Sequence, residues 1–149
     1  MIHLYMAKAE NRKARFDYEI LEKFTAGIEL LGHEVKSIRA GKISLAGAFI
    51  AVRGNEAFLI GVEVPPYQPK NAPHEYDEAR PRKLLLTKEE VSELRKAEAA
   101  KGLTIVPLSV YNKGRFLKVD LAIARGKKQF DKREAIKKRD IERDLKRSL

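Results

Sequence analysis

The chain has 149 residues, which is enough for one domain with a substantial core, and it contains no cysteine. Disulfide frameworks, thiolate nucleophiles and cysteine zinc sites are therefore excluded. The 31 Lys and Arg residues outnumber the 21 Asp and Glu residues and give a net charge of +10, which favours a polyanionic partner. No apolar run approaches the ~18–20 residues of a membrane helix and no secretory signal is visible, so we expect a cytoplasmic protein without membrane partners.

The first half of the chain predicts strands and one short helix. Alternating apolar and polar residues predict a strand over residues 16–30, bent at Gly27. Apolar residues at helical spacing, followed by a glycine, predict a short amphipathic helix over residues 31–41. Two apolar runs within residues 49–64 are separated by Gly-Asn and predict a tight hairpin. Residues 65–81 contain five prolines and predict a long irregular loop.

The second half predicts a capped helix and a second hairpin. Residues 87–90 have the capping-box spacing, so a helix should begin there and end near Gly102. Residues 103–111 and 115–124 predict two strands joined by a short loop with glycine in a left-handed conformation. Five or six strands with a few helices indicate a mainly β protein. The expected fold is an OB-like small β-barrel, closed or partly open, with short flanking helices.

Charge is concentrated at the C-terminus. Residues 125–149 hold eleven basic and five acidic residues, a net of +6, whereas residues 1–124 carry +4. The C-terminal segment also has few apolar residues, so it cannot bury much surface by itself. We therefore expect a flexible N-terminus over residues 1–9, an RNA-binding body over 10–124 and a basic tail over 125–149. The tail has helix-compatible composition and should be disordered or fraying when free and helical when bound to RNA; the alternative is a charged helix packed loosely on the body.

Motifs for catalysis and metal binding are incomplete. His33-Glu34 and His74-Glu75 begin like a zinc helix, but each lacks the second histidine one turn later. A glycine spacing typical of a phosphate loop ends at Gly32, yet His33 and Glu34 stand where lysine and Ser/Thr are needed. The sequence therefore predicts no catalytic residue, no metal site and no cofactor, and we expect His33 to be exposed in the first helical turn.

Basic residues outside the end of the tail form three groups. Because Lys and Arg release counterions from phosphates, such groups give affinity for RNA without sequence preference. A solvated charged surface would explain any one group, whereas three groups together favour RNA. Glu34 lies among them and either accepts hydrogen bonds from bases or orients a neighbouring cation, of which the second is favoured. The groups are Lys36, Arg39 and Lys42; Arg80, Arg82 and Lys83; and Arg125, Lys127 and Lys128.

Seven short motifs occur in one order along the chain. Together they resemble the SsrA-binding protein (small protein B) family, the bacterial partner of transfer-messenger RNA, over nearly the whole chain. The resemblance implies an OB-like body that binds the transfer-RNA-like part of that RNA. It also implies entry into stalled ribosomes for trans-translation, with no catalysis by the protein; we expect a monomer with one RNA. The motifs are residues 11–15, 18–21, 26–28, 34–42, 82–86, 124–128 and 131–133.

The resemblance also implies two sets of functional residues. The first set would line the RNA-binding face and comprises Asn11, Glu34, Val35, Lys36, Ser37, Arg39, Lys42, Arg82, Lys83, Leu84 and Leu85. The second set would act in the ribosomal decoding centre and comprises Arg125, Lys127, Lys128, Phe130, Asp131, Lys132 and Arg133. Phe130 departs from the His or Tyr that relatives often carry, but it keeps an aromatic face for stacking. The rest of the tail would enter the empty mRNA channel.

Two alternatives remain open at this point. A general or ribosomal OB-type RNA-binding protein fits the composition and expected fold equally well. An enzyme that acts on RNA is a third interpretation, although no paired carboxylates lie in a stretch that would raise a pKa for acid catalysis. A preference for transfer-messenger RNA over unrelated folded RNA would distinguish the transfer-messenger RNA adaptor from a general RNA-binding protein.

Overall fold

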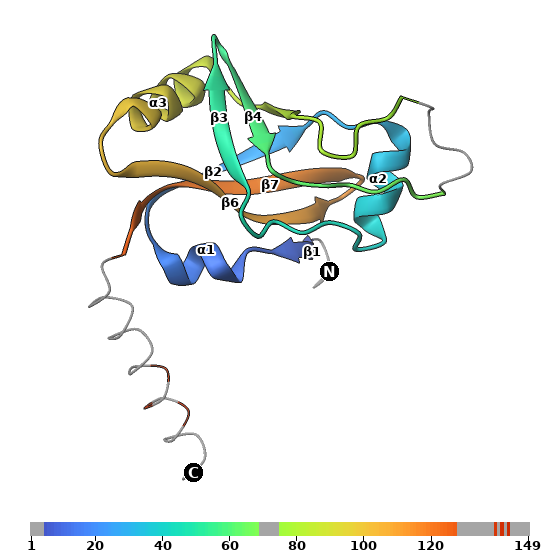
Figure 1. Cartoon of the computed structure of the whole chain (residues 1–149), viewed down its shortest axis with the longest axis horizontal. Helices are drawn as coiled ribbons and strands as arrows, with labels where there is room; N and C mark the ends of the chain where they lie inside the picture. Colours follow the sequence, from blue (N-terminus) through green and yellow to red (C-terminus); the bar gives the residue numbers. More distant parts are fainter. Residues whose placement is uncertain (1–4, 69–74, 128–138, 140, 142, 144–149) are drawn as a thin grey trace.

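The computed structural model describes residues 5–68, 75–127, 139, 141 and 143. Ten elements follow one another in the body, and Figure 1 shows α1 and α2 toward opposite ends of the molecule. In chain order they are β1 Tyr5–Glu10, α1 Arg12–Asp17, β2 Tyr18–Ile28, α2 Gly32–Arg39, β3 Phe49–Arg53, β4 Glu56–Ile60, β5 Arg82–Leu85, α3 Lys88–Ala99, β6 Leu103–Lys113 and β7 Phe116–Gly126.

The described strands form one seven-stranded antiparallel sheet in the order β1-β6-β7-β2-β5-β4-β3. The mainly β prediction is therefore confirmed, but the sheet is not closed into the expected small barrel. The hairpin of β3 and β4 crosses over β6 and β7 (Figure 1), and β3 contacts β6 without pairing to it. The order begins at β1 and ends at β3, and these two edge strands do not pair with each other, so the sheet stays open.

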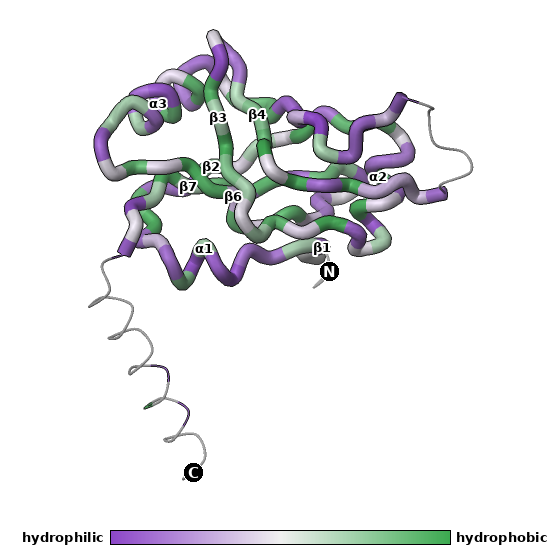
Figure 2. The backbone as a smooth tube through the Cα atoms, in the orientation of Figure 1, coloured by the Kyte–Doolittle hydropathy of each residue, from purple (hydrophilic) through white to green (hydrophobic). Residues whose placement is uncertain are grey.

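Two bulges divide the core between the two faces of the sheet. The register shifts at Leu21 in β2 and at Leu108 in β6. One extra residue reverses the side on which the following side chains lie. Ile20 therefore packs beneath α1 in a small cluster, whereas Phe24 on the same strand lies in the main core. Figure 2 shows the apolar positions gathered along the crossing strands, with polar residues on α1, α2 and the loops.

The structure adds elements that the periodic patterns did not predict. Tyr5–Glu10 pairs with β6 as an edge strand, where the sequence suggested a flexible N-terminus over residues 1–9. Asn11 then begins α1 because its side-chain oxygen accepts a hydrogen bond from the Ala14 N–H at 3.1 Å. The strand predicted over 16–30 is confirmed as β2, although residues 16 and 17 belong to α1, and the pairing of β2 with β7 shifts register at Leu21.

The capping box predicted at residues 87–90 is confirmed at the start of α3. Thr87 Oγ1 accepts from the Glu90 N–H at 3.2 Å, and the Glu90 carboxylate accepts from the Thr87 N–H at 2.9 Å. The helix then buries Val91, Leu94 and Ala97 against the main core. These reciprocal bonds satisfy two N–H groups that would otherwise lack partners in the helix.

Replacing this cap should cost a measurable amount of stability. Thr87→Ala removes the acceptor for the Glu90 N–H, so we expect the free energy of unfolding in urea to fall by ~1 kcal/mol. Ser92→Ala removes a hydroxyl inside the same helix and serves as the matched control, with a change within about 0.5 kcal/mol. Equal losses in the two variants would contradict the role assigned to the cap.

Candidate nucleic-acid interface

Helix α2 presents one buried and one exposed face. Glu34, Ser37 and Ile38 are fully buried, whereas Lys36 and Arg39 are exposed. The Glu34 carboxylate accepts from the Leu31 N–H at 2.7 Å and so caps its own helix. The amphipathic helix predicted from the sequence is therefore confirmed, but one of its buried side chains is an acid.

Two arginines and a tyrosine surround the Glu34 carboxylate. Arg82 donates to Oε2 from Nη2 at 2.6 Å and from Nε at 3.0 Å. Arg80 donates to Oε1 from Nη2 and to Oε2 from Nε, and the Tyr76 hydroxyl donates to Oε2 at 3.0 Å. We call these four residues the Glu34 clasp. Of the two interpretations of Glu34, the geometry shows the one in which the acid orients neighbouring cations.

The clasp shifts the pKa values of both of its weakly acidic members. Burial raises the pKa of Glu34, but hydrogen bonds from Arg80, the Leu31 N–H and Arg82 outweigh burial and lower it from 4.5 to about 2. Burial and the neighbouring Glu34 carboxylate raise the pKa of Tyr76 from 10.0 to about 12. Glu34 is therefore charged and Tyr76 neutral throughout the physiological range.

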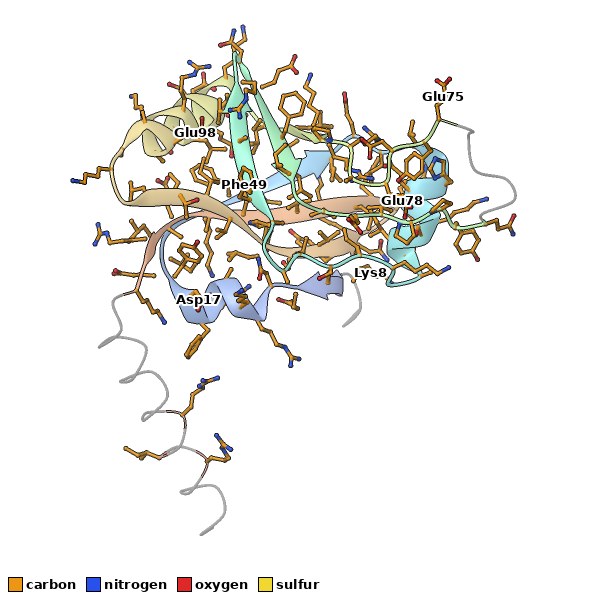
Figure 3. All side chains as sticks on the ribbon, in the orientation of Figure 1. Lys8, Asp17, Phe49, Glu75, Glu78 and Glu98 are labelled. Carbon is orange, nitrogen blue, oxygen red and sulfur yellow. The ribbon has the colours of Figure 1, made fainter. Side chains whose placement is uncertain are left out.

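The clasp also attaches the proline-rich segment to α2. Arg82 donates from Nη1 to the Val62 carbonyl and from Nη2 to the Glu78 carbonyl, each at 2.9 Å. Ser37 Oγ donates to the Pro65 carbonyl at 2.7 Å. Figure 3 shows Glu78 close beside α2. The described parts of this predicted loop are therefore hydrogen-bonded to α2 and β5, although they contain no regular secondary structure.

A hollow of about 360 Å³ lies between α2, β5 and the β6–β7 turn, and we call it the α2–β5 hollow. Leu85 and Phe116 contribute apolar surface and are 50% and 65% exposed. Arg39 donates from Nη2 to the Arg115 carbonyl at 2.6 Å, so α2 is also linked to the turn. The lining residues are Gly27, Ile28, Leu30, Val35, Arg39, Leu85, Arg115, Phe116, Leu117 and Lys118.

The composition of the hollow suits a nucleic acid. An exposed aromatic ring offers a face on which a base can stack, and cations at the rim can neutralise phosphates. Phe116 supplies the ring, and Arg39 and Lys118 supply charge. The described residues contain no cluster of three or more His, Asp or Glu side chains able to hold a metal ion.

The structure brings two of the predicted basic groups together. Val35 and Arg39 from α2 and Leu85 from β5 line the same hollow, and Glu34 pairs directly with Arg82. Lys36 is exposed, Lys42 lies 5.5 Å from the centre of the Tyr67 ring, and Lys83 lies 3.6 Å from Glu56. Five predicted site residues are instead buried, namely Asn11, Glu34, Ser37, Arg82 and Leu84.

Sequence reasoning missed four lining residues at the β6–β7 turn and the start of β7, namely Arg115, Phe116, Leu117 and Lys118. A signal was present, because Phe116 follows Arg115 directly after the turn glycine Gly114. An aromatic residue beside cations at a hairpin tip is typical of an exposed contact, since turns lie on the surface.

Asn11 lies elsewhere. Its Nδ2 donates to the Pro107 carbonyl at 2.8 Å, and it lines a second hollow of about 380 Å³ together with Phe49 and residues of α1. The start of the tail is also at α1, where the Lys127 N–H donates to the Asp17 carbonyl at 2.9 Å and Arg125 lies 3.8 Å from Glu19. Figure 3 labels Asp17 there, toward the opposite end of the molecule from Glu78.

The remaining tail residues assigned to the decoding centre lie outside the described residues; they are Lys128, Phe130, Asp131, Lys132 and Arg133. Of the tail beyond Lys127, the structure describes Arg139, Ile141 and Arg143. Within the described ranges, no helix combines the length and apolar character that a membrane span requires.

His33 differs from expectation. Its side chain is half-buried rather than exposed, and its ring lies edge-on to Tyr76 with centroids 4.4 Å apart. The clasp explains the difference, because Tyr76 must approach the first turn of α2 to reach Glu34.

Comparison with known proteins decides the family. The family model described as "SmpB protein" matches residues 8–149. The chain belongs to the SmpB protein family. It is 51% identical to the SsrA-binding protein of Chloroflexus aggregans over 95% of this chain and 89% of that one. It is 48% identical to the SsrA-binding protein of Acaryochloris marina over 100% and 97%.

A solved structure agrees with this assignment. A chain from the structure described as "tmRNA-SmpB: a journey to the center of the bacterial ribosome" is 46% identical. It superposes with a TM-score of 0.66 and covers 85% of this chain and 92% of that chain. The resemblance stated from the sequence motifs is therefore confirmed.

The Glu34 clasp predicts a specific acid sensitivity. Folding lowers the Glu34 pKa, so the unfolded chain binds the proton more readily and stability falls as pH falls from 4.5 through about 2. Glu34→Gln lacks this titration. We expect the variant to be less stable than the wild type by roughly 3 kcal/mol at pH 7, with the gap closing toward pH 2.

Urea unfolding between pH 7 and pH 2 measures this gap. Glu29→Gln removes an exposed carboxylate just before α2 and is the control, for which we expect little change in either stability or its pH dependence. A gap between wild type and Glu34→Gln that stays constant down to pH 2 would contradict the pairing.

Proposed function

We propose that this protein is a cytoplasmic adaptor that binds the transfer-RNA-like part of transfer-messenger RNA. The complex would then enter ribosomes stalled on messages without a stop codon, in trans-translation. Membership of the SmpB protein family supports the role, as do relatives named as SsrA-binding proteins. The observation that carries it is the α2–β5 hollow, where Arg39 of α2 and Arg115 and Lys118 of the β6–β7 hairpin surround exposed apolar surface.

The body would hold the folded RNA on an open, OB-like sheet. Phe116 would stack on a base, while Arg39, Lys36 and Lys118 would neutralise nearby phosphates. Val35 and Leu85 would contribute apolar contact at the same surface. Lys42 and Lys83 would extend the charged rim, and the buried residues Glu34, Ser37, Arg82 and Leu84 would support this surface from behind. Asn11, which lies at α1, would take no part in this surface.

The tail would provide the second contact, inside the ribosome. Arg125, Lys127 and the following residues, Lys128, Phe130, Asp131, Lys132 and Arg133, would act in the decoding centre. The rest would enter the vacant mRNA channel as a helix. A vacant channel is walled by ribosomal RNA phosphates, which accounts for a net of +6 over residues 125–149.

The distance between the two contacts follows from one strand. Phe116 begins β7 and Gly126 ends it, the strand being eleven residues long. At 3.3 Å per residue, the ends of the strand are roughly 33 Å apart. A monomer can therefore hold one RNA at one end while its tail acts at the other, and no step in this role requires a catalytic group.

Removing the exposed ring should weaken binding to transfer-messenger RNA. We expect Phe116→Ala to raise the dissociation constant about 5- to 150-fold, because stacking on one base contributes about 1–3 kcal/mol. Phe49→Ala removes another exposed aromatic ring, in the second hollow, and is the control; Phe49 is 44% exposed and Phe116 65%. The measurement is a binding titration with bulk transfer RNA as competitor at fixed salt. Equal affinity of the wild type for both RNAs would favour a general RNA-binding protein instead.

Removing the tail should separate binding from ribosome rescue. A chain that ends after Arg125 keeps the α2–β5 hollow, so we expect its affinity for transfer-messenger RNA to stay within about threefold of the wild type. Peptide tagging on ribosomes stalled in a purified translation system should be abolished. Phe116→Ala should show the opposite behaviour to the shortened chain. It should bind transfer-messenger RNA more weakly, but it should still support tagging when the protein concentration is high enough to restore binding. Normal tagging by the shortened chain would refute the proposed division of roles.

A further inference from the structure

We infer that the Glu34 clasp is a positioning device for the α2–β5 hollow, and that the Tyr76 hydroxyl is its connecting group. The inference rests on the proposed function, since it concerns how the RNA-binding surface keeps its shape. Tyr76 is assigned no contact with RNA; it acts through Glu34 and Arg82.

The clasp joins the inward faces of the elements whose outward faces form the hollow. On α2, Glu34 lies inward, while Val35 and Arg39 line the hollow. On β5, Arg82 lies inward, and Leu85 lines the hollow. The ion pair between Glu34 and Arg82 therefore fixes how far α2 stands from β5, and hence the width of the hollow.

The hydrogen bonds that the Glu34 carboxylate accepts fix the orientation of α2 relative to β5 as well as their separation. Among the described residues, six hydrogen bonds reach Glu34: one from the Leu31 N–H, two from Arg80, two from Arg82 and one from Tyr76. Apolar residues could fill such a space without loss of stability, because a buried ion pair contributes little net stabilisation. What the paired N–H groups of Arg82, both directed at Oε2, add is a defined distance and orientation between two elements.

Tyr76 connects three groups through one oxygen. Its single O–H proton faces two acceptors, Glu34 Oε2 at 3.0 Å and the Val64 carbonyl at 2.7 Å, and its oxygen accepts from Arg82 Nη2 at 3.0 Å. The hydroxyl thus joins α2, β5 and the segment after β4. Its ring packs edge-on against His33, an arrangement that phenylalanine would preserve.

Tyr76→Phe tests the inference because it removes the hydroxyl and keeps the ring. Full-length wild type and variant are titrated with transfer-messenger RNA at several salt concentrations. A mispositioned α2 engages fewer phosphates at once, so we expect about threefold to tenfold weaker binding. We also expect a shallower dependence of log K on log salt, by about one unit for each phosphate that the variant no longer neutralises. Arg82→Lys keeps the buried charge but cannot donate to Glu34 Oε2, the Val62 carbonyl and the Glu78 carbonyl from one planar guanidinium, and it should show the same two changes.

Leu94→Ala controls for loss of stability alone, because Leu94 is fully buried on α3 and lines no part of the hollow. Below its melting temperature, this variant should keep the wild-type affinity and salt slope. Wild-type affinity and slope in Tyr76→Phe would overturn the inference and leave the proposed function intact. A wild type with no preference for transfer-messenger RNA over transfer RNA would overturn the proposed function, and the inference with it.

Discussion

A carboxylate buried away from water needs cations or hydrogen-bond donors beside it, and those of Glu34 come from three other segments of the chain. Arg82 is buried with it, and Arg80 approaches from the solvent side. Because both arginines lie more than forty residues away in sequence, the pairing brings the end of the proline-rich segment and the start of β5 onto α2. The position of α2 beside the sheet, and the hollow that it borders, depend on this contact.

The second organising element is β7. It pairs with β2 on one side and with β6 on the other, and both register shifts lie in those neighbours rather than in β7. The strand β7 is therefore regular, whereas the extra residues in β2 and β6 move the side chains that follow them to the other face of the sheet. Its first residue, Phe116, stands in the α2–β5 hollow, and its last, Gly126, leads to the tail. A regular strand is inextensible, so the separation between the two ends is set by residue count.

Local patterns in the sequence predicted the elements that local physics determines. The alternation along β2, the capping box of α3 and the glycine of the β6–β7 turn each act over a few residues, and each is present in the structure. The bulge at Leu21 was invisible because apolar residues stay on even numbers on both sides of it, even though they face different clusters. The four-residue strand β5 is too short to show a period.

The candidate site was predictable in outline and not in its chemistry. The motifs placed α2 and residues 82–86 at one RNA-binding surface, and the structure brings them together. Which side chains face outward depended on contacts between distant segments, so Glu34 and Arg82 proved to be buried. Phe116 belongs to the hollow only because the β6–β7 turn reaches α2, where Arg39 donates to the Arg115 carbonyl.

The burial of these charges changes how the net charge of +10 should be understood. The carboxylate of Glu34 engages two of the three cations in the group Arg80, Arg82 and Lys83, and Glu56 lies near the third. The body therefore offers fewer free cations to an RNA than its composition suggests, whereas residues 125–149 carry +6. In the proposed role, recognition by the body would depend more on shape and on stacking at Phe116, and recognition by the tail more on charge. That division suits a folded RNA at one end of the molecule and a phosphate-lined channel at the other.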